Sequence, residues 1–255
     1  MKKTGETIDQ ILGGKLKIIQ KEKGYRFSID ALLLAHFVRL KKKDHLLELG
    51  TGSGVISLIL ARRWCCERVV GAEIQEDLHE MALRNVVLNG LAHQVSIIPC
   101  DVRRIEAFLE AKSFDAVVIN PPYRKMSSGR INPDDQKAMA RHEIGGTLGD
   151  FLKAAVYVLK ERGRLFIIYP AARVVELFTR MRMFRLEPKR VRVVHSYEDS
   201  EGEFLLAEGR KGGREALKVL PPLFIYDQMK GYSRAMTDMF IDLAARACVP
   251  TDRRR

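Results

Sequence analysis

The chain has 255 residues, of which 46% are hydrophobic and 30% are charged. This apolar content is too high for a disordered chain, and the length predicts one or two domains whose core needs no disulfide or metal staple. The 44 lysines and arginines exceed the 32 aspartates and glutamates, which gives a formal net charge of +12. Such an excess favours a polyanionic partner, either a nucleic acid or an anionic membrane.

Residues 1–43 are expected to form a basic extension that packs on the core. Two short extended segments, Leu16–Gln20 and Tyr25–Phe27, lie on either side of a Lys-Glu-Lys-Gly turn and predict a β-hairpin. The apolar run that follows predicts a helix, and Ser28 or Asp30 is placed to cap its first amides.

From residue 44 onward, short apolar runs alternate with helical segments. The expected strands are His45–Leu49, Arg68–Glu73, Val95–Pro99, Phe114–Ile119, Arg164–Tyr169, Val191–Ser196 and Phe204–Glu208. The expected helices are Val55–Arg63, Glu76–Asn89, Val102–Glu110, Asp150–Leu159, Ala171–Met183 and one near Ser233–Arg246. This alternation is typical of right-handed βαβ units, so the sequence predicts an α/β fold with a largely parallel sheet.

Residues 124–149 interrupt this alternation. They hold five glycines or prolines, mixed charges and no clear apolar period. Loops of this length in compact domains are usually functional or disordered. We expect one domain over residues 44–255 that contains this loop and a C-terminal extension at 217–255.

The charge is divided unevenly along the chain. Residues 1–43 carry 11 basic and 4 acidic side chains, residues 44–123 carry 7 and 11, and residues 124–255 carry 26 and 17. A mildly acidic central block therefore lies between two basic flanks. The Arg-rich stretches 180–192 and 253–255 match no motif.

Targeting and redox signals are sparse. No run approaches the roughly 18 uninterrupted apolar residues of a membrane span, and the N-terminal segment lacks the apolar stretch of a secretory signal. The four cysteines form no CxxC pair and no cluster with zinc-like spacing. We therefore expect a cytoplasmic protein with reduced thiols, no metal and no membrane partner.

The first chemical motif is a glycine loop, ELGTGSG at residues 48–54, between a strand and a helix. Its glycines allow a tight turn and a close approach of the backbone to a ligand. The GxGxG spacing differs from the GxGxxG of dinucleotide sites, where amides must cover two phosphates. S-adenosylmethionine has no phosphate, and its ammonium needs an acidic neighbour such as Glu48. The candidate cofactor residues in this motif are Glu48, Gly50, Thr51, Gly52 and Gly54; a plain tight turn is the alternative.

Two acidic residues follow at the ends of the next strands. Glu73 ends its strand 23 positions after Gly50, where doubly wound folds place a carboxylate that accepts both ribose hydroxyls. Asp101 follows the next strand and could bind an adenine amino group or cap the following helix. We include the neighbouring Ile74 and Val102 among the candidate cofactor contacts.

The fourth motif is an apolar strand that ends in Asn120-Pro121-Pro122-Tyr123. The prolines stop the strand and leave the Asn120 side chain and the Pro121 carbonyl as acceptors. An amide or exocyclic amine is a poor nucleophile because its lone pair is delocalised. Two acceptors that hold its two hydrogens favour a pyramidal nitrogen, and a Tyr123 ring can stack on a planar substrate. We predict these four residues to be catalytic, by positioning rather than through a metal.

Together these motifs resemble class I S-adenosylmethionine-dependent amino-methyltransferases over roughly residues 27–170. The resemblance implies a Rossmann-like, mostly parallel seven-stranded sheet with helices on both faces, an S-adenosylmethionine cofactor, and Asn120 near that cofactor. More narrowly, the chain is similar to the bacterial tRNA(Val) adenine N6-methyltransferase family in the segments Arg26–Ala35, Ala140–Glu143 and Pro221–Tyr226. By this resemblance, Phe27 and Asp30 lie over the cofactor and the loop at 124–149 meets the substrate.

The predicted function is therefore N6-methylation of a tRNA adenosine beside the anticodon, with tRNA as the partner. Glutamine N5-methylation of a release factor or ribosomal protein is the main alternative, since a side-chain amide presents the same NH2 group. Methylation of another RNA or of DNA, and a cofactor-binding RNA chaperone without turnover, are further alternatives. The sequence does not indicate an oligomeric state.

Overall fold

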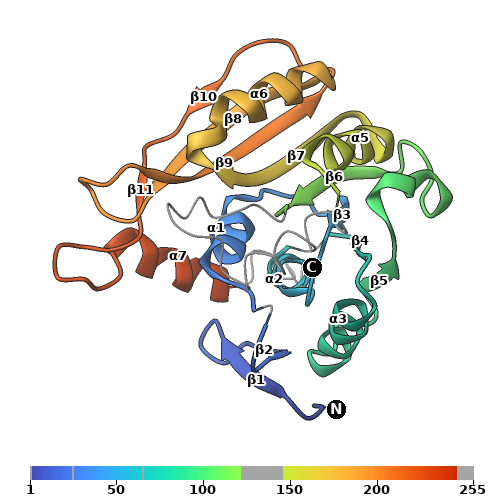
Figure 1. The fold of residues 1–255 in the computed structure, drawn as a ribbon, viewed down its shortest axis with the longest axis vertical. Helices are drawn as coiled ribbons and strands as arrows, with labels where there is room; N and C mark the ends of the chain where they lie inside the picture. The colour runs from blue at the N-terminus through green and yellow to red at the C-terminus, as the bar shows by residue number, and fades with distance from the viewer. Residues whose placement is uncertain (1, 25, 65, 122–145, 246–255) are drawn as a thin grey trace, which may run out of the picture.

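The computed structural model describes residues 2–24, 26–64, 66–121 and 146–245. Its centre is a sheet with the strand order β10-β8-β9-β7-β6-β3-β4-β5, in which β11 also pairs with β8 (Figure 1). The seven long strands are β3 (His45–Leu49), β4 (Arg68–Glu73), β5 (Val95–Pro99), β6 (Phe114–Ile119), β7 (Leu159–Pro170), β8 (Leu186–His195) and β9 (Gly202–Lys211). Two-residue strands, β10 (Lys218–Val219) and β11 (Leu223–Phe224), extend the β8 edge. Only β9 runs antiparallel to its neighbours among these pairs, so the predicted mostly parallel sheet is confirmed, with two short strands added to the seven that were predicted.

Helices cover both faces of the sheet because successive strand residues point to opposite sides. In β3, Leu46 packs into one buried cluster and Leu47 into the other. The first cluster lies under α1 (Ile29–Phe37), α2 (Val55–Arg63), α3 (Glu76–Leu88) and α7 (Arg234–Ala244). The second lies under η1 (Val102–Ala107), α5 (Leu148–Val158) and α6 (Val174–Met183), which follows the short turn η2 (Ala171–Arg173). No helix in the described ranges is long and apolar enough to cross a membrane.

The N-terminal hairpin exists, but its predicted pairing is wrong. Strand β1 (Glu6–Ile11) pairs antiparallel with β2 (Leu16–Lys21), so the partner lies before β2 rather than at Tyr25–Phe27. The turn between them contains Gly13 and Gly14, both with positive φ. This Gly-Gly pair between two extended segments is the turn signal that the prediction missed.

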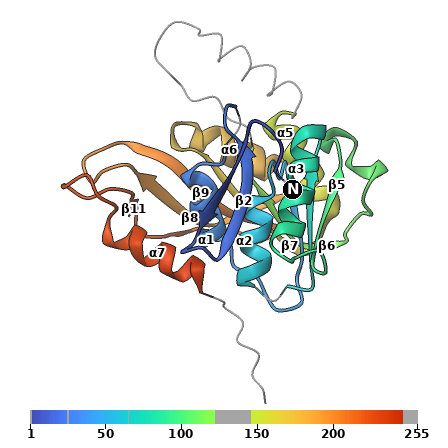
Figure 2. The same ribbon diagram turned by 90° about the horizontal axis from the view of Figure 1, so that it is seen from below.

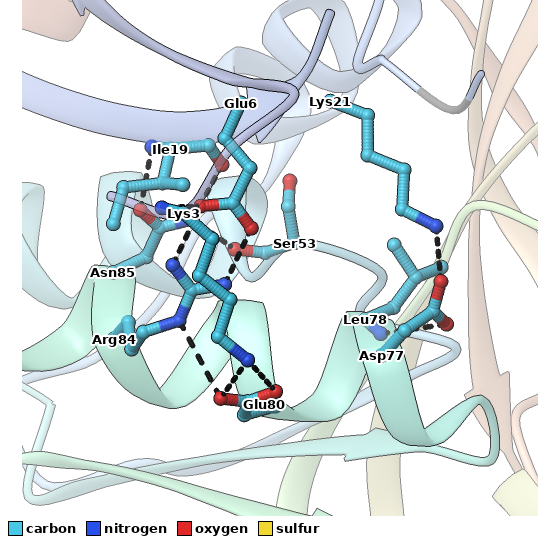
Figure 3. A network of polar contacts seen from close by, with 10 residues as sticks. All are labelled: Lys3, Glu6, Ile19, Lys21, Ser53, Asp77, Leu78, Glu80, Arg84 and Asn85. Carbon is cyan, nitrogen blue, oxygen red and sulfur yellow. Dashed lines mark hydrogen bonds and ion pairs between the residues drawn. The ribbon is translucent and has the colours of Figure 1, made fainter. Parts of the chain in front are cut away.

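The hairpin is fastened to α3 by polar contacts that cross the gap between the two (Figure 3). The fully buried Asn85 accepts a hydrogen bond from Ile19 N (2.6 Å) and donates to the carbonyl oxygens of Ile19 (3.0 Å) and Ser53 (2.9 Å). Arg84 also donates two hydrogen bonds to the buried carboxylate of Glu6, at 2.6 and 2.7 Å. Because Ser53 belongs to the glycine loop, Asn85 joins the hairpin, α3 and that loop.

The predicted α-helix at Val102–Glu110 is instead the 3-10 helix η1, which ends at Ala107. Arg104 has non-helical angles (φ −125°, ψ 32°), and Arg104 N bonds to the carbonyl three residues earlier, at Asp101. The strands β7, β8 and β9 are longer than predicted because charged residues at their ends, such as Lys160 and Glu187, hid the strand pattern.

Candidate functional site

A cavity of about 310 Å³ lies at the C-terminal ends of β3, β4, β5 and β6. Strand β3 lies between β4, which follows it in the chain, and β6, which comes later in the chain. The order of the strands therefore reverses at β3, and open α/β sheets bind ligands at such a switch point. Nine of the predicted site residues line the cavity: Phe27, Asp30, Gly50, Gly52, Glu73, Ile74, Val102, Asn120 and Pro121.

The glycine loop is held tightly against β4. The amides of Gly50 and Thr51 both donate to the Ala72 carbonyl oxygen, at 2.9 and 3.0 Å. Gly50 has a φ of +72°, and a Cβ there would lie 3.4 Å from Cε1 of Phe151. A Cβ would only reach van der Waals contact with the ring, but any side chain would strain the backbone at this positive φ, so the turn favours glycine here.

Glu73 lies at the end of β4 with its carboxylate fixed from both sides. Its Oε2 accepts a hydrogen bond from Gly52 N (2.8 Å), and its Oε1 accepts one from Gln75 N (2.9 Å). The residue is only 4% exposed, and burial raises the pKa of the carboxyl group. Each carboxylate oxygen can accept more than one hydrogen bond, so Glu73 can still accept hydroxyl groups from the cavity.

Glu48 lies beneath the glycine loop and does not line the cavity. Its Oε2 accepts hydrogen bonds from Thr51 Oγ1 (2.7 Å), Ser57 N (2.9 Å) and Ser57 Oγ (2.5 Å). Burial raises the pKa of this carboxyl to about 7, although those hydrogen bonds act in the opposite direction. A direct contact of Glu48, Thr51 or Gly54 with the cofactor remains a prediction.

Asp101 caps the N-terminus of η1, which is one of the two roles predicted for it. Its Oδ1 accepts a hydrogen bond from Arg103 N at 2.9 Å at the start of η1, and Arg103 Nη2 donates to Oδ2 at 2.7 Å. The neighbouring residues Cys100 and Val102 line the cavity, whereas Asp101 does not. An adenine contact for Asp101 remains a prediction.

Asn120, immediately after β6, is held by the first turn of α1. Its Nδ2 donates to Asp30 Oδ2 at 3.0 Å, and Asp30 Oδ1 accepts a hydrogen bond from Ala31 N at 2.9 Å. A carboxylate can only accept hydrogen bonds, so this contact fixes the amide orientation and leaves the Asn120 Oδ1 atom as an acceptor. Pro122, Tyr123, the Ala140–Glu143 segment and the loop up to residue 145 lie outside the described residues.

The sequence analysis missed several residues that line the cavity. Phe151 comes from α5, and Glu203 and Phe204 come from the start of β9, each far in sequence from the motifs. Arg26 also lines the cavity, and its guanidinium donates to the Lys21 carbonyl at 2.9 Å. Arg26 could have been found from the sequence, because it directly precedes Phe27.

Comparison with known proteins gives a consistent picture. Residues 28–183 match the methyltransferase small domain family. A protein from Porphyromonas gingivalis, named tRNA1(Val) (adenine(37)-N6)-methyltransferase, is 34% identical over 169 residues. That alignment covers 66% of each protein, so the chain spans just under two thirds of its relative's length.

Solved structures show the same fold. A predicted O-methyltransferase from Agrobacterium tumefaciens has a TM-score of 0.68 at 22% identity, with 85% of this chain and 97% of that one covered. An S-adenosylmethionine-dependent O-methyltransferase from Thermotoga maritima has a TM-score of 0.53 at 18% identity, with coverage of 76% and 69%. At these identities the likeness concerns the fold alone.

Proposed function

The chain belongs to the methyltransferase small domain family, and from this premise we propose that it methylates the N6 amino group of an adenosine in tRNA. The methyl donor in this proposal is S-adenosylmethionine. The observation that carries the proposal is the position of Asn120 and Pro121 at the cavity wall, with the amide NH2 of Asn120 turned toward Asp30.

The cavity suits a cationic cofactor that carries a ribose. Glu73 would accept the ribose hydroxyls, because its two oxygens are already oriented by backbone amides. Gly50 and Gly52 allow close approach, while Ile74 and Val102 supply apolar surface for the adenine. Glu48 lies behind the loop, and its ionised form would add negative potential for the ammonium as the pH rises above its pKa of about 7. When bound, the cofactor supplies an electrophilic methyl group on a sulfonium.

The residues of the chain position the nucleophile. Asn120 Oδ1 and the Pro121 carbonyl oxygen would each accept one N–H of the target amino group, which localises the nitrogen lone pair. Asp30 acts as a positioning residue, since it holds the Asn120 amide in the orientation that presents Oδ1. Held in this way, the nitrogen lone pair would be directed at the methyl group that the cofactor would supply, and one amino proton would be released to solvent.

Several observations support RNA as the substrate. The chain carries a net charge of +12, and Lys41–Lys43 are exposed at the end of the basic extension. The Porphyromonas gingivalis relative is named for adenine 37 of tRNA1(Val), which suggests the same nucleotide here. We propose that residues 44–255 form the catalytic domain in the cytoplasm, and that the extension at 1–43 and the loop at 124–149 contact the tRNA. A base paired within a duplex cannot reach the cofactor, so the target must be unpaired or flipped out.

A protein glutamine is the competing substrate, because its NH2 group would suit the same two acceptors. The test is to incubate the protein with radiolabelled S-adenosylmethionine and either total tRNA or purified release factors. We expect label in tRNA and none in the release factors. Label in release factors alone would contradict the proposal.

A further inference from the structure

A second hollow, of about 160 Å³, lies where the C-terminal ends of α1 and α2 meet β8 and α7. Four arginines line it, and we call it the arginine pocket: Arg39, Arg63, Arg190 and Arg192. Helices α1 and α2 both begin beside the candidate cavity, and α7 lies next to them (Figure 2). The nine residues of α2 rise about 14 Å, so the arginine pocket is well separated from the methyl-transfer site.

The positive charge of the arginine pocket is only half compensated. Asp242 pairs with Arg63 and lies 3.1 Å from Nε2 of His36. Glu208 accepts a hydrogen bond from Arg190 Nε at 2.8 Å. Within the described part of the chain, neither Arg39 nor Arg192 has a carboxylate partner. Four guanidinium groups thus face two carboxylates.

Several buried donors in the arginine pocket have no acceptor among the described residues. These are Nε and Nη1 of Arg63, Nε of Arg192 and the indole Nε1 of Trp64. Arg63 is only 8% exposed, and Trp64 also lines the hollow. Buried polar groups without partners are rare because each loses its hydrogen bonds to water and gains none in return. All four donors belong to residues that line the hollow, so this part of the molecule has more hydrogen-bond donors than acceptors.

The electrostatics of the arginine pocket point to an anion. Burial lowers the pKa of Arg192, and repulsion from Arg39 lowers it further. Burial, followed by repulsion from Arg63, also lowers the pKa of His36, which therefore adds little positive charge. The C-terminal ends of α1 and α2 oppose an anion with roughly half an elementary charge each. Two uncompensated guanidinium groups outweigh that opposition.

We propose that the arginine pocket binds a phosphoryl group. Guanidinium groups match the tetrahedral, acceptor-rich phosphoryl oxygens through paired hydrogen bonds. The hollow is far larger than the roughly 15 Å³ that one water needs, so it has room for such a group. The group comes either from an RNA backbone, which the exposed Lys41–Lys43 segment would continue to contact, or from free inorganic phosphate.

Trp64 is the only tryptophan of the chain, so its fluorescence reports on the arginine pocket directly. Inorganic phosphate should be titrated into the full-length protein at constant ionic strength, with chloride as the reference anion. We expect a saturable, phosphate-specific change that Arg192→Gln weakens at least tenfold. Arg39→Gln, at an exposed position, should weaken it several-fold, and thermal unfolding should confirm that both variants are folded.

The matched control is Arg214→Gln, an exposed arginine that does not line the hollow and should leave the affinity within twofold. The proposal is overturned if the wild-type protein shows no saturable response beyond chloride, or if both variants bind phosphate as the wild type does. This readout does not depend on methyl transfer.

Total tRNA added to the phosphate complex separates the two sources of the phosphoryl group. Displacement of phosphate by tRNA assigns the arginine pocket to an RNA backbone, whereas retention of phosphate assigns it to the free ion. Both results support a phosphoryl site.

Discussion

Helices α1 and α2 connect two regions of opposite charge. At their N-terminal ends lies the candidate cavity, with the buried carboxylates of Asp30, Glu48 and Glu73 around it. At their C-terminal ends lies the arginine pocket. The helix dipole favours this arrangement, since acidic groups are stabilised at helix N-termini and basic groups at C-termini. The net charge of +12 is thus not spread evenly over the molecule. An acidic region suits a cationic cofactor, and a separate basic region suits a polyanion.

The two regions also differ in how completely their charged groups are bonded. Each oxygen of Glu73 accepts a backbone amide, and Glu48 accepts three hydrogen bonds, so the cavity is organised before a ligand binds. The arginine pocket instead retains buried donors on Arg63 and Arg192 that lack an acceptor within the described ranges. We infer that the first region is a preformed site and that the second is completed by its ligand.

The largest expected effect separates chemistry from cofactor binding. Asn120→Ala removes an acceptor for the target amino group, so methyl transfer should fall roughly 1000-fold, as for other preorganised hydrogen-bonding groups. The Kd for S-adenosylmethionine, measured by calorimetry, should change less than threefold. Equal losses of binding and transfer would place Asn120 in the cofactor site instead.

The next effect concerns the acidic wall. Glu73→Gln removes the charged acceptor that the ribose hydroxyls would use, and a hydrogen bond to a charged group contributes about 1.5–3 kcal/mol. At 1.4 kcal/mol per tenfold, cofactor affinity should fall roughly 10- to 100-fold. Glu76→Gln, on the exposed start of α3, is the matched control and should bind as the wild type does. Wild-type affinity in Glu73→Gln would remove the ribose assignment.

These two residues illustrate what the sequence can predict. Asn120 and Glu73 stand at strand ends, and a parallel sheet brings such ends to one edge whatever the details of packing. Phe151 and Phe204 could not be predicted, because only tertiary packing brings α5 and β9 to that edge. The burial of Glu48 beneath the glycine loop could not be predicted either, because it depends on how that loop folds over the side chain.

The arginine pocket was beyond prediction for the same reason. Its arginines come from the residues after α1, the end of α2 and the strand β8. In the sequence, Arg190 and Arg192 belong only to an unmatched Arg-rich stretch. The hairpin pairing failed for a different reason, since the turn at Gly13 and Gly14 was a local signal that was overlooked.

A smaller effect links stability to function at Glu48. Its carboxyl has a folded pKa of about 7 against an ordinary 4.5, so the folded state favours the neutral form. The stability that this provides is complete below pH 4.5 and is lost as the pH rises to 7 and beyond. At pH 8 the ionised group costs on the order of 3 kcal/mol, at 1.36 kcal/mol per pKa unit.

Glu48→Gln keeps an acceptor oxygen without the charge. Chemical unfolding should show the variant to be more stable than the wild type at pH 8, with the difference vanishing near pH 4.5. Its affinity for S-adenosylmethionine should be weaker at pH 8, by roughly tenfold, because a nearby negative charge is lost. Identical unfolding curves at pH 8 would contradict the buried, ionised carboxylate.

The smallest expected effect concerns the exposed lysines at the end of the N-terminal extension. Replacing Lys41, Lys42 and Lys43 with alanine should weaken tRNA binding a few-fold for every RNA sequence. The slope of log K against log salt should become shallower by up to about 0.9 per lost phosphate contact. Filter binding between low and moderate salt measures both. A salt-independent affinity in the wild-type protein would remove the charge argument for RNA.

The identity of the methylated atom tests the central claim most directly. The protein should be incubated with labelled S-adenosylmethionine and tRNA that lacks this modification, and the digested nucleosides should be separated by liquid chromatography against standards of each methyladenosine isomer before mass spectrometry. Because Asn120 and Pro121 are placed to hold an amino group by its hydrogens, the label should appear as N6-methyladenosine in the wild-type reaction and disappear with Asn120→Ala. A label on a ring nitrogen, a ribose or a guanosine would contradict the account.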